Sequence, residues 1–275
     1  MKIKNFTYRK DDIISSDGIL EFCLSNNICY IKADYFYHGL NDNYLNNNWR
    51  NGNHPKFLSN KVVIGHSDYE VNNDIANQFN KVFCTNKTAS NKNTYSLPLG
   101  LTNDCDDTNI HRVYGNKEVM LKVLNEGNQK NDLLYLNFHP DSHSTRPAIY
   151  DSFNNLPYVK VGDREATLKG RENFLRDISR SKFTLCPRGN GIDTHRLWEA
   201  LYMGSVPIVK YEITHDNVKD LPILFVDDFL EITESFLNEK YEEIINKEWH
   251  MEKLKLSYWK KEILNTFSVL KTIGA

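Results

Sequence analysis

The sequence predicts an α/β protein built from two parallel-sheet units. Short runs of β-branched and aromatic residues alternate with polar or amphipathic stretches, which favours strand–helix layers over a β-sandwich. The length of 275 residues suits one large domain or two small ones. Hydrophobic residues make up 40% of the chain and charged residues 25%, as in an ordinary globular protein, which argues against wholesale disorder.

In the first half we expect four strands separated by polar loops. The expected strands cover residues 29–36, 61–65, 81–84 and 95–99. The polar stretch 70–80 has modest helical spacing, and the Asn-rich stretch 41–55 is expected to be a loop long enough to carry function.

A second α/β unit begins near residue 132. Its expected strands cover residues 132–138, 158–161, 181–186, 206–210 and 223–226. Its expected helices start near 148, cover 171–179 and 193–203, and fill most of the tail after 231, while a helix over 115–130 bridges the halves. We therefore predict an N-terminal domain at 1–128, a C-terminal domain at 129–260, and a C-terminal helix over 261–275 that packs back on the N-terminal domain.

Charge and composition exclude several classes of protein. The net charge of -2 argues against a general nucleic-acid binder, although a local basic pocket for a small anion stays open. No apolar run reaches the length of a membrane span, and the N-terminus does not have the pattern of a signal peptide. The five scattered cysteines lack CxxC spacing, so neither a disulfide framework nor a zinc site is expected.

One segment, residues 181–209, carries the chemical information. It is predicted as strand, glycine loop, helix, tight turn and strand. Gly189 and Gly191 let the backbone approach a ligand closely, and Asp193 or Thr194 is a suitable N-cap for the helix. The start of that helix offers unpaired N–H groups with partial positive charge, which favours an anion.

Charged side chains flank the same loop. Arg188 and Arg196 can hold phosphate oxygens in their planar forks, and Glu199 can accept hydroxyl hydrogen bonds from a ribose. A plain tight turn with a solvated Arg–Glu pair is the equally open alternative. The segment does not have the Walker pattern, and it does not have a G-x-G-x-x-G motif directly after a first N-terminal strand, which disfavours dinucleotide-dependent oxidoreductases.

The segment resembles the signature of exostosin-like glycosyltransferases, the glycosyltransferase family 47 and its viral and bacterial relatives. The resemblance lies in Cys-Pro-Arg-Gly, the following Asp and Arg, and Trp-Glu-Ala before Gly-x-x-Pro-Ile-Val, and it is dense over about thirty residues. Weaker resemblances occur at 86–101, in LLYLNF with Arg146, at 224–229 and at 251–259. Coverage is good for roughly 130–260 and loose before that.

The resemblance implies a GT-B-like fold, with two Rossmann-like domains facing each other across a cleft. It implies a donor site in the C-terminal domain for a UDP- or GDP-linked sugar, with no cofactor and no metal. The implied donor-binding residues are Arg146, Arg188, Gly189, Asn190, Gly191, Asp193, Thr194, His195, Arg196 and Glu199. Among these, Arg188 and Arg196 would bind the diphosphate, Glu199 the ribose, and Asn190 and Asp193 would contact the sugar or shape the loop.

An inverting transferase also needs a base that removes the proton from the acceptor hydroxyl. His66 and Asp68, after the strand at 61–65, are the expected catalytic pair, and Asp34 is a further candidate; each is equally suited to hydrogen-bonding within its loop. Asp104-Cys105-Asp106 resembles a metal-binding acidic triplet but is expected to be a solvated loop. His139 and His143 are expected in a phosphate- or sugar-contacting loop.

These observations lead to one hypothesis and two rivals. We expect an inverting, metal-independent glycosyltransferase that acts on a glycan hydroxyl, in the cytoplasm of a bacterium or of a virus-infected host cell. The first rival is a non-catalytic protein that binds sugar or nucleotide and retains the fold. The second is an enzyme that processes sugar nucleotides, such as an epimerase.

Overall fold

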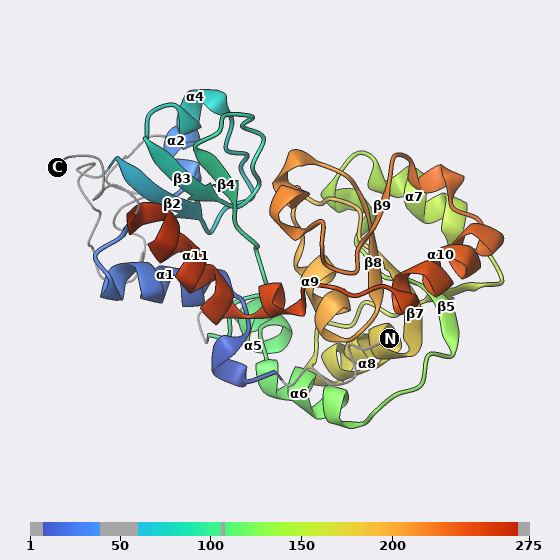
Figure 1. The fold of residues 1–275 in the computed structure, drawn as a ribbon. Coiled ribbons are helices and arrows are strands. Elements are labelled where there is room, and N and C mark those ends of the chain that lie inside the picture. The colour runs from blue at the N-terminus through green and yellow to red at the C-terminus, as the bar shows by residue number, and fades with distance from the viewer. Residues whose placement is uncertain (1–7, 39–59, 106–107, 269–275) are drawn as a thin grey trace.

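The structure, a computed structural model, describes residues 8–38, 60–105 and 108–268. They form two α/β units, each built on one parallel sheet (Figure 1). The first sheet has the order β1-β2-β3-β4 and comprises Cys29–Lys32, Lys61–Gly65, Lys81–Cys84 and Thr94–Ser96. The second has the order β6-β5-β7-β8-β9 and comprises, from β5 to β9, Asp132–Leu136, Val159–Val161, Ser181–Leu185, Val206–Lys210 and Leu224–Val226.

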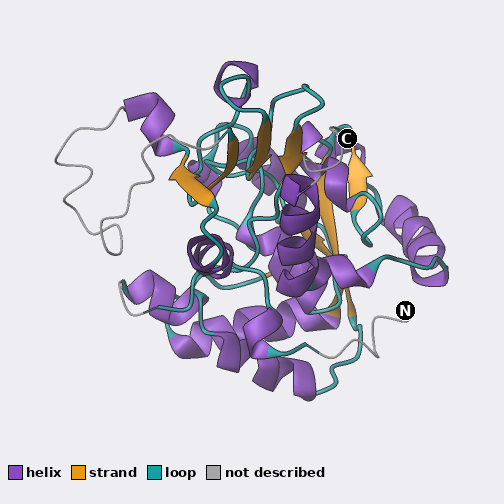
Figure 2. Cartoon of the chain, turned by 60° about the vertical axis from the view of Figure 1, so that its left-hand side comes forward, coloured by secondary structure: helices purple, strands orange, loops and turns teal. Residues whose placement is uncertain are grey.

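Helices lie around the strands of both sheets (Figure 2). Those before the second sheet are α1 (Ser16–Ser25), α2 (Asp34–His38), α4 (Asn73–Ala76), α5 (Asn109–Tyr114) and α6 (Lys117–Asn125). Those after it begins are α7 (Arg146–Phe153), α8 (Leu168–Arg180), α9 (His195–Tyr202), α10 (Glu234–Asn246) and α11 (Leu256–Ser268). Short 3-10 turns lie at Lys10–Asp12, Pro140–Ser142, Ile213–Val218 (η4), Phe229–Glu231 (η5) and Met251–Leu254.

The expected strand runs are confirmed in position, but two are much shorter than expected. Of the run 95–99, only Tyr95 and Ser96 belong to a strand, β4. The run 29–36 does not remain a strand, because α2 begins at Asp34. Its partner strand β2 ends at Gly65, which pairs with Lys32, so the residues that follow Lys32 have no partner on β2. The loop expected at 41–55 lies outside the described residues.

The helix expected to bridge the halves lies against the second unit. Lys122 of α6 donates to Glu172 of α8 at 3.0 Å, and Arg176 of α8 binds Glu126 with two hydrogen bonds of 2.7 and 2.6 Å. The last helix, α11, returns to the first unit (Figure 1). Its Thr266 carbonyl accepts a hydrogen bond from Lys81 at 2.5 Å, and it begins at Leu256 rather than at 261.

The two units share one continuous hydrophobic core. Leu97 and Leu99 of the first unit belong to the same buried cluster as Leu197 and Trp198 of α9. Ile14 N–H donates to the Tyr202 hydroxyl at 2.9 Å, which fixes the start of the first unit to the end of α9. Two parallel-sheet units that meet in this way, with a cleft between them, have the predicted GT-B-like arrangement. Within the described ranges, no helix combines the length and the apolar character that crossing a bilayer requires.

Candidate functional site

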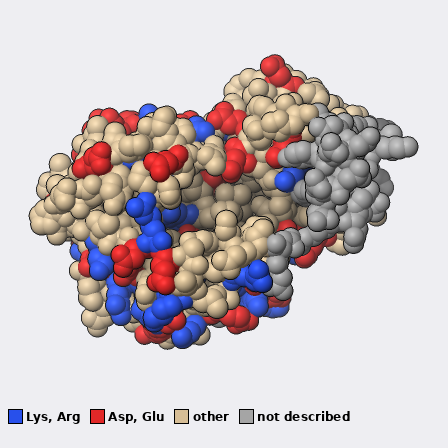
Figure 3. All heavy atoms as spheres, turned by 180° about the vertical axis from the view of Figure 1, so that it is seen from behind, with Lys and Arg blue, Asp and Glu red and all other residues tan. Residues whose placement is uncertain are grey.

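A cleft of about 590 Å³ opens where the strand order of the second sheet reverses, between β5 and β7. Ligands of open α/β sheets bind at such switch points, outside the carboxyl ends of the strands. Asn137 follows β5, Gly189 follows β7, and both line the cleft; Asp68 and Leu99 close it from the first unit. Figure 3 shows the surface hollowed between the two parts of the molecule, with charged side chains of both signs around the hollow.

The start of α9 faces this cleft without a cap. Thr194 is the N-cap residue, yet its side chain makes no capping hydrogen bond, and its buried hydroxyl has no hydrogen-bond partner in the part of the chain that the structure describes. Arg196, in the first turn, has no ion-pair partner among the described residues, and its Nε is buried and unpaired. Since an unmade hydrogen bond at a buried donor is costly, this end of the helix is organised for an acceptor from outside the chain.

Glu199, one turn further along α9, is held by a buried arginine. Arg171 of α8 donates through Nη1 to Glu199 Oε1 at 2.5 Å, and both side chains are almost fully buried. Arg171 Nε has no hydrogen-bond partner within the described ranges. The pair lines the cleft, so Arg171 orients the Glu199 carboxylate and adds a second guanidinium to the same site as Arg196.

Asp193 shapes the loop rather than meeting the cleft with a free carboxylate. Its carboxylate accepts hydrogen bonds from Leu99 N–H at 2.8 Å and from the Trp198 ring at 2.9 Å. Burial raises the pKa of Asp193 to about 6. Of the two roles expected for Asp193, the structure supports loop shaping, and the loop it shapes is tied to the first unit.

At Gly191 the first unit packs directly against the loop. A Cβ added to Gly191 would lie 2.9 Å from Asn86 Nδ2 and 3.2 Å from Asp68 Oδ1. Asn86 is fully buried, donates to Ser67 O and accepts from Asp193 N–H, both at 2.9 Å. The glycine therefore permits close approach of the other unit, in addition to the ligand approach that the sequence predicts. Asn190, beside it, is exposed at the cleft.

Arg146 holds the loop rather than reaching freely toward a phosphate. Its guanidinium donates to the carbonyls of Arg188 at 2.8 Å, His139 at 3.1 Å and Pro187 at 3.0 Å. Burial, with Arg196 nearby, lowers the pKa of Arg146 to about 10, so it remains cationic at neutral pH. It lines the cleft and contributes charge, but three of its donors are already used.

The side chain of Arg188 contacts the first unit, and its place in the diphosphate site stays a prediction. Its Nη2 binds Glu70 Oε1 of the first unit at 3.1 Å. It lines a separate cavity of about 390 Å³ beyond the ends of β7, β8 and β9. The side chains of successive loop residues leave the backbone in different directions, which the sequence does not fix. Arg188 therefore connects the units.

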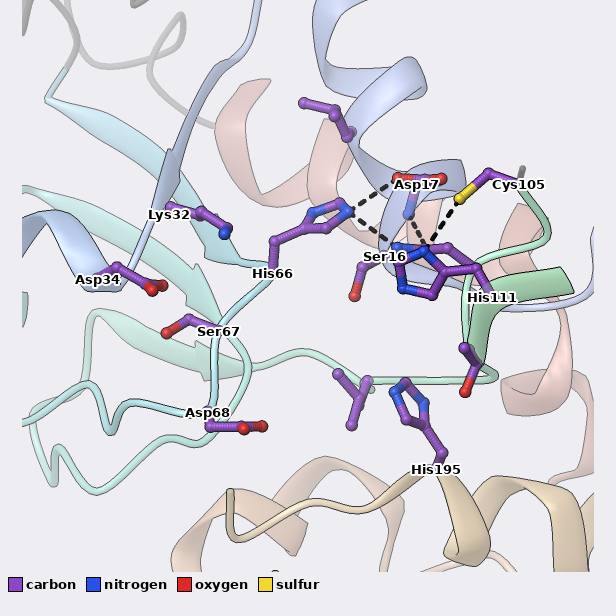
Figure 4. A pocket seen from close by; sticks show the side chains of 14 residues that line it. Ser16, Asp17, Lys32, Asp34, His66, Ser67, Asp68, Cys105, His111 and His195 are labelled. Carbon is purple, nitrogen blue, oxygen red and sulfur yellow. Dashed lines mark hydrogen bonds and ion pairs between the residues drawn. The ribbon is translucent and has the colours of Figure 1, made fainter. Parts of the chain in front are cut away.

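The first unit has its own polar pocket of about 420 Å³, beside the cleft (Figure 4). His66 lines it with both ring nitrogens engaged, Nδ1 with the Tyr30 hydroxyl at 2.7 Å and Nε2 with Asp17 Oδ1 at 2.9 Å. Asp68 is exposed and makes no hydrogen bond or ion pair within the described ranges. Of the expected catalytic pair, Asp68 is therefore available to a ligand and His66 is not. Asp34 also lines this pocket.

His195, the first residue of α9, lies where the pocket and the cleft join. It lines both cavities and projects toward the pocket in Figure 4. Its Nδ1 lies 2.8 Å from the Gly100 carbonyl, which can only accept, so Nδ1 carries the proton. Burial lowers the pKa of the imidazole, so His195 is neutral at pH 7. In this tautomer the other ring nitrogen, Nε2, accepts rather than donates a hydrogen bond.

The described residues contain no group of three or more His, Cys, Asp or Glu side chains arranged to hold a metal ion. Asp104 lies 3.7 Å from Lys10, and Cys105 contacts His111 at 3.3 Å, while Asp106 lies outside the described residues. His139 lines the cleft, and His143 lies beside it, with Nδ1 2.8 Å from the Thr145 hydroxyl.

Sequence reasoning missed Arg171 and Asn86. Arg171 was hidden in an amphipathic helix, where an arginine normally faces solvent. Asn86 has a positive φ of 50°, a conformation in which Asn is enriched, but nothing in its neighbourhood marks it as a link between units.

Comparisons with known proteins agree with this picture at the level of the second unit. A protein-family model described as RXYLT1 C-terminal domain matches residues 158–269, which include the whole segment 181–209. The match covers less than half of the chain, and it does not single out the family 47 type of viruses and bacteria. No curated protein matches the chain in sequence.

Solved structures of an alpha1,3-fucosyltransferase are similar to the chain. One of them shows 18% identity, a TM-score of 0.43, and coverage of 76% of this chain and 71% of that chain. The structure with GDP shows 16% identity, a TM-score of 0.44, and coverage of 78% of each chain. The structure with GDP-fucose shows 16% identity, a TM-score of 0.39, and coverage of 80% of each chain.

Proposed function

We propose that the protein is a glycosyltransferase that moves a sugar from a UDP- or GDP-linked donor to a glycan hydroxyl. The observation that carries the proposal is the uncapped start of α9. There Thr194 Oγ1, Arg196 Nε and Arg171 Nε are buried without hydrogen-bond partners in the described part of the chain, around one cleft. The family match over 158–269 covers these residues and supports the assignment.

The donor diphosphate binds at this helix start. Arg196 and the free N–H groups of the first turn meet the phosphate oxygens, as helix N-termini commonly do. Glu199 binds the ribose: Arg171 holds its Oε1, and its Oε2 makes no hydrogen bond to any described residue. Because negative charge grows on the leaving diphosphate, these fixed cationic groups lower the barrier, and transfer proceeds without a divalent ion.

The acceptor glycan binds in the polar pocket of the first unit. Hydroxyl, carboxylate and amide side chains line it, including Ser16, Asp17, Asp34, Thr102 and Asn103. Such groups pair with the hydroxyls of a sugar. The pocket and the cleft share Asp68, Leu99, Thr102 and His195, so an acceptor hydroxyl there approaches the donor sugar from the opposite unit, the geometry of an inverting displacement.

A donor screen tests the proposal. The folded protein is heated with UDP, GDP, CMP and sugars linked to each, in EDTA and in Mg²⁺, and turnover is followed by release of the nucleotide in the presence of a glycan panel. We expect a higher melting temperature with UDP or GDP, since a ligand of the folded state stabilises it, and equal turnover in EDTA.

Arg196→Ala is expected to abolish the thermal shift and to lower turnover about 100-fold, the usual cost of losing one contact to a developing charge. The matched control is Arg180→Ala at the end of α8, an exposed residue whose guanidinium donates to Asn128 at 3.3 Å. An Arg196→Ala protein that folds and transfers sugar at the wild-type rate would contradict the assignment of the diphosphate site to the start of α9.

The engagement of both His66 nitrogens favours a second candidate, a binding protein without catalysis. Thermal stabilisation by a nucleotide sugar with no release of nucleotide, across the acceptor panel, would select this candidate.

A further inference from the structure

We propose that His195 is the general base of the transfer, in place of His66. The proposal rests on the proposed function, because a base is needed only if the enzyme transfers a sugar to an acceptor hydroxyl. It rests on three independent features of the site. These are the tautomer of His195, its position where the two cavities join, and the hydrogen bonds that already occupy both ring nitrogens of His66.

The tautomer leaves one nitrogen with a lone pair. Because Nδ1 donates to the Gly100 carbonyl, Nε2 carries no proton in the neutral ring. Nε2 makes no hydrogen bond to any described residue, and the His195 side chain is partly exposed and lines both cavities. A neutral imidazole that accepts through Nε2 and is oriented through Nδ1 has the arrangement of a histidine base.

The position places Nε2 between donor and acceptor. His195 is the residue directly before Arg196 on the helix start assigned to the diphosphate, and it also lines the polar pocket assigned to the acceptor. In Figure 4 its ring enters the pocket from α9, on the side away from His66. An acceptor hydroxyl in the pocket therefore meets Nε2 on its way to the anomeric carbon.

The surroundings accommodate the charge that the reaction creates. Asp68 from the first unit and Glu199 from α9 both favour the imidazolium form, whereas burial and Arg171 of α8 disfavour it. His195 is therefore neutral and ready before reaction, and two carboxylates stabilise the proton once it has moved. Asp68 is therefore a residue that acts through His195 by its charge.

The step balances without a co-reactant. The acceptor oxygen forms a bond to the anomeric carbon while its proton passes to Nε2. The bond from the anomeric carbon to the phosphate oxygen breaks, and its electron pair leaves with the nucleoside diphosphate. The proton on His195 then passes to water in the pocket.

The first test reads the tautomer and needs no turnover. Long-range ¹H–¹⁵N spectra of histidine-labelled protein are recorded from pH 5 to 8, and the His195 signals are assigned by their loss in His195→Asn. We expect a neutral ring protonated at Nδ1 that titrates below about pH 6.5, the ordinary value for histidine. A ring protonated at Nε2, or one already cationic at pH 7, would overturn the proposal.

The second test uses the UDP- or GDP-sugar that the wild type turns over. In His195→Asn the side-chain amide can still donate to the Gly100 carbonyl, but no basic nitrogen remains. We expect kcat to fall about 100-fold or more, with the donor KM within a factor of about three, and the acid limb of the pH profile to disappear. His250→Asn, on the surface beside Asp220, is the matched control.

The outcomes separate this proposal from the proposed function. If the wild type transfers sugar and His195→Asn does so at the same kcat with the acid limb unchanged, His195 is not the base, although the protein is a transferase. If His195→Asn raises only the donor KM, the residue binds the donor, and the proposal is equally wrong. Failure of the wild type to transfer removes the proposed function, while the NMR result still decides the tautomer.

Discussion

Asp193 connects the donor loop to the first unit through the Leu99 backbone, and it does so with a buried carboxylate. Burial raises its pKa from 3.8 to about 6, so the folded protein binds the proton more tightly than the unfolded chain does. The stabilising effect of that proton is fully present below pH 3.8 and is lost as the pH rises through about 6.

Asp193→Asn is therefore expected to remove this pH dependence. Relative to the variant, the wild type should lose about 2 kcal/mol of unfolding free energy between pH 4 and pH 7. Each unit of pKa shift corresponds to about 1.4 kcal/mol, and the unfolded carboxyl is already about half ionised at pH 4. Urea titrations of both proteins at the two pH values measure the difference. A difference that stays constant with pH would contradict the raised pKa. Asp227→Asn, at an exposed position, is the control.

At the scale of residues, the sequence predicted which side chains lie at the site better than it predicted what those side chains contact. The uncapped helix start and Arg196 follow from the glycine loop and the charges around it. The divergence of Arg188 toward Glu70 does not, because the direction of a loop side chain depends on the other unit. The tautomer of His195 likewise depends on a carbonyl 95 positions earlier in the chain.

At the scale of elements, α8 and α9 are joined by the buried pair of Arg171 and Glu199. A buried ion pair contributes little net stability, but removal of one partner leaves an uncompensated charge. Arg171→Met is therefore expected to cost about 3–5 kcal/mol, whereas Arg171→Met combined with Glu199→Leu should recover most of that loss.

A double-mutant cycle on the free energy of unfolding measures this coupling. The exposed pair of Lys240 and Glu243 on α10 provides the control cycle, with an expected coupling below about 1 kcal/mol. Additive losses at Arg171 and Glu199 would show that the two helices are not joined through this pair. The double variant should also lose donor binding, because the Glu199 carboxylate that binds the ribose is gone.

Most elements could be predicted because local pattern determines them. The runs at 61–65, 81–84 and 206–210 became β2, β3 and β8 with the expected bounds. The run at 29–36 was predicted too long, because where β1 ends is set by where its partner β2 ends. The packing of α6 on α8 brings together buried apolar residues and ion-pair partners about 50 positions apart, which local pattern does not reveal.

At the scale of the whole molecule, the shared core and the return of α11 make the two units one folding unit. Leu256 of α11 packs against Gly18 of α1, and Phe267 contacts Phe83 of β3 with ring centroids 5.6 Å apart. The chain therefore closes on the unit in which it begins, after the second unit is complete. A cleft between units joined in this way has its walls fixed by packing rather than by a free hinge.

Trp259→Ala tests whether the molecule unfolds as one. Trp259 on α11 is 2% exposed and belongs to the core cluster that both units share. Its truncation is expected to cost about 3–5 kcal/mol and to shift a single unfolding transition, with far-UV circular dichroism and intrinsic tryptophan fluorescence changing at the same urea concentration. Leu264→Ala, on the exposed side of the same helix, should change stability by less than about 0.5 kcal/mol. Two separate transitions, with only the earlier one moved by Trp259→Ala, would mean that the cleft lies between independently folding units. The fixed position of His195 in the wall of the acceptor pocket would then lose its physical basis.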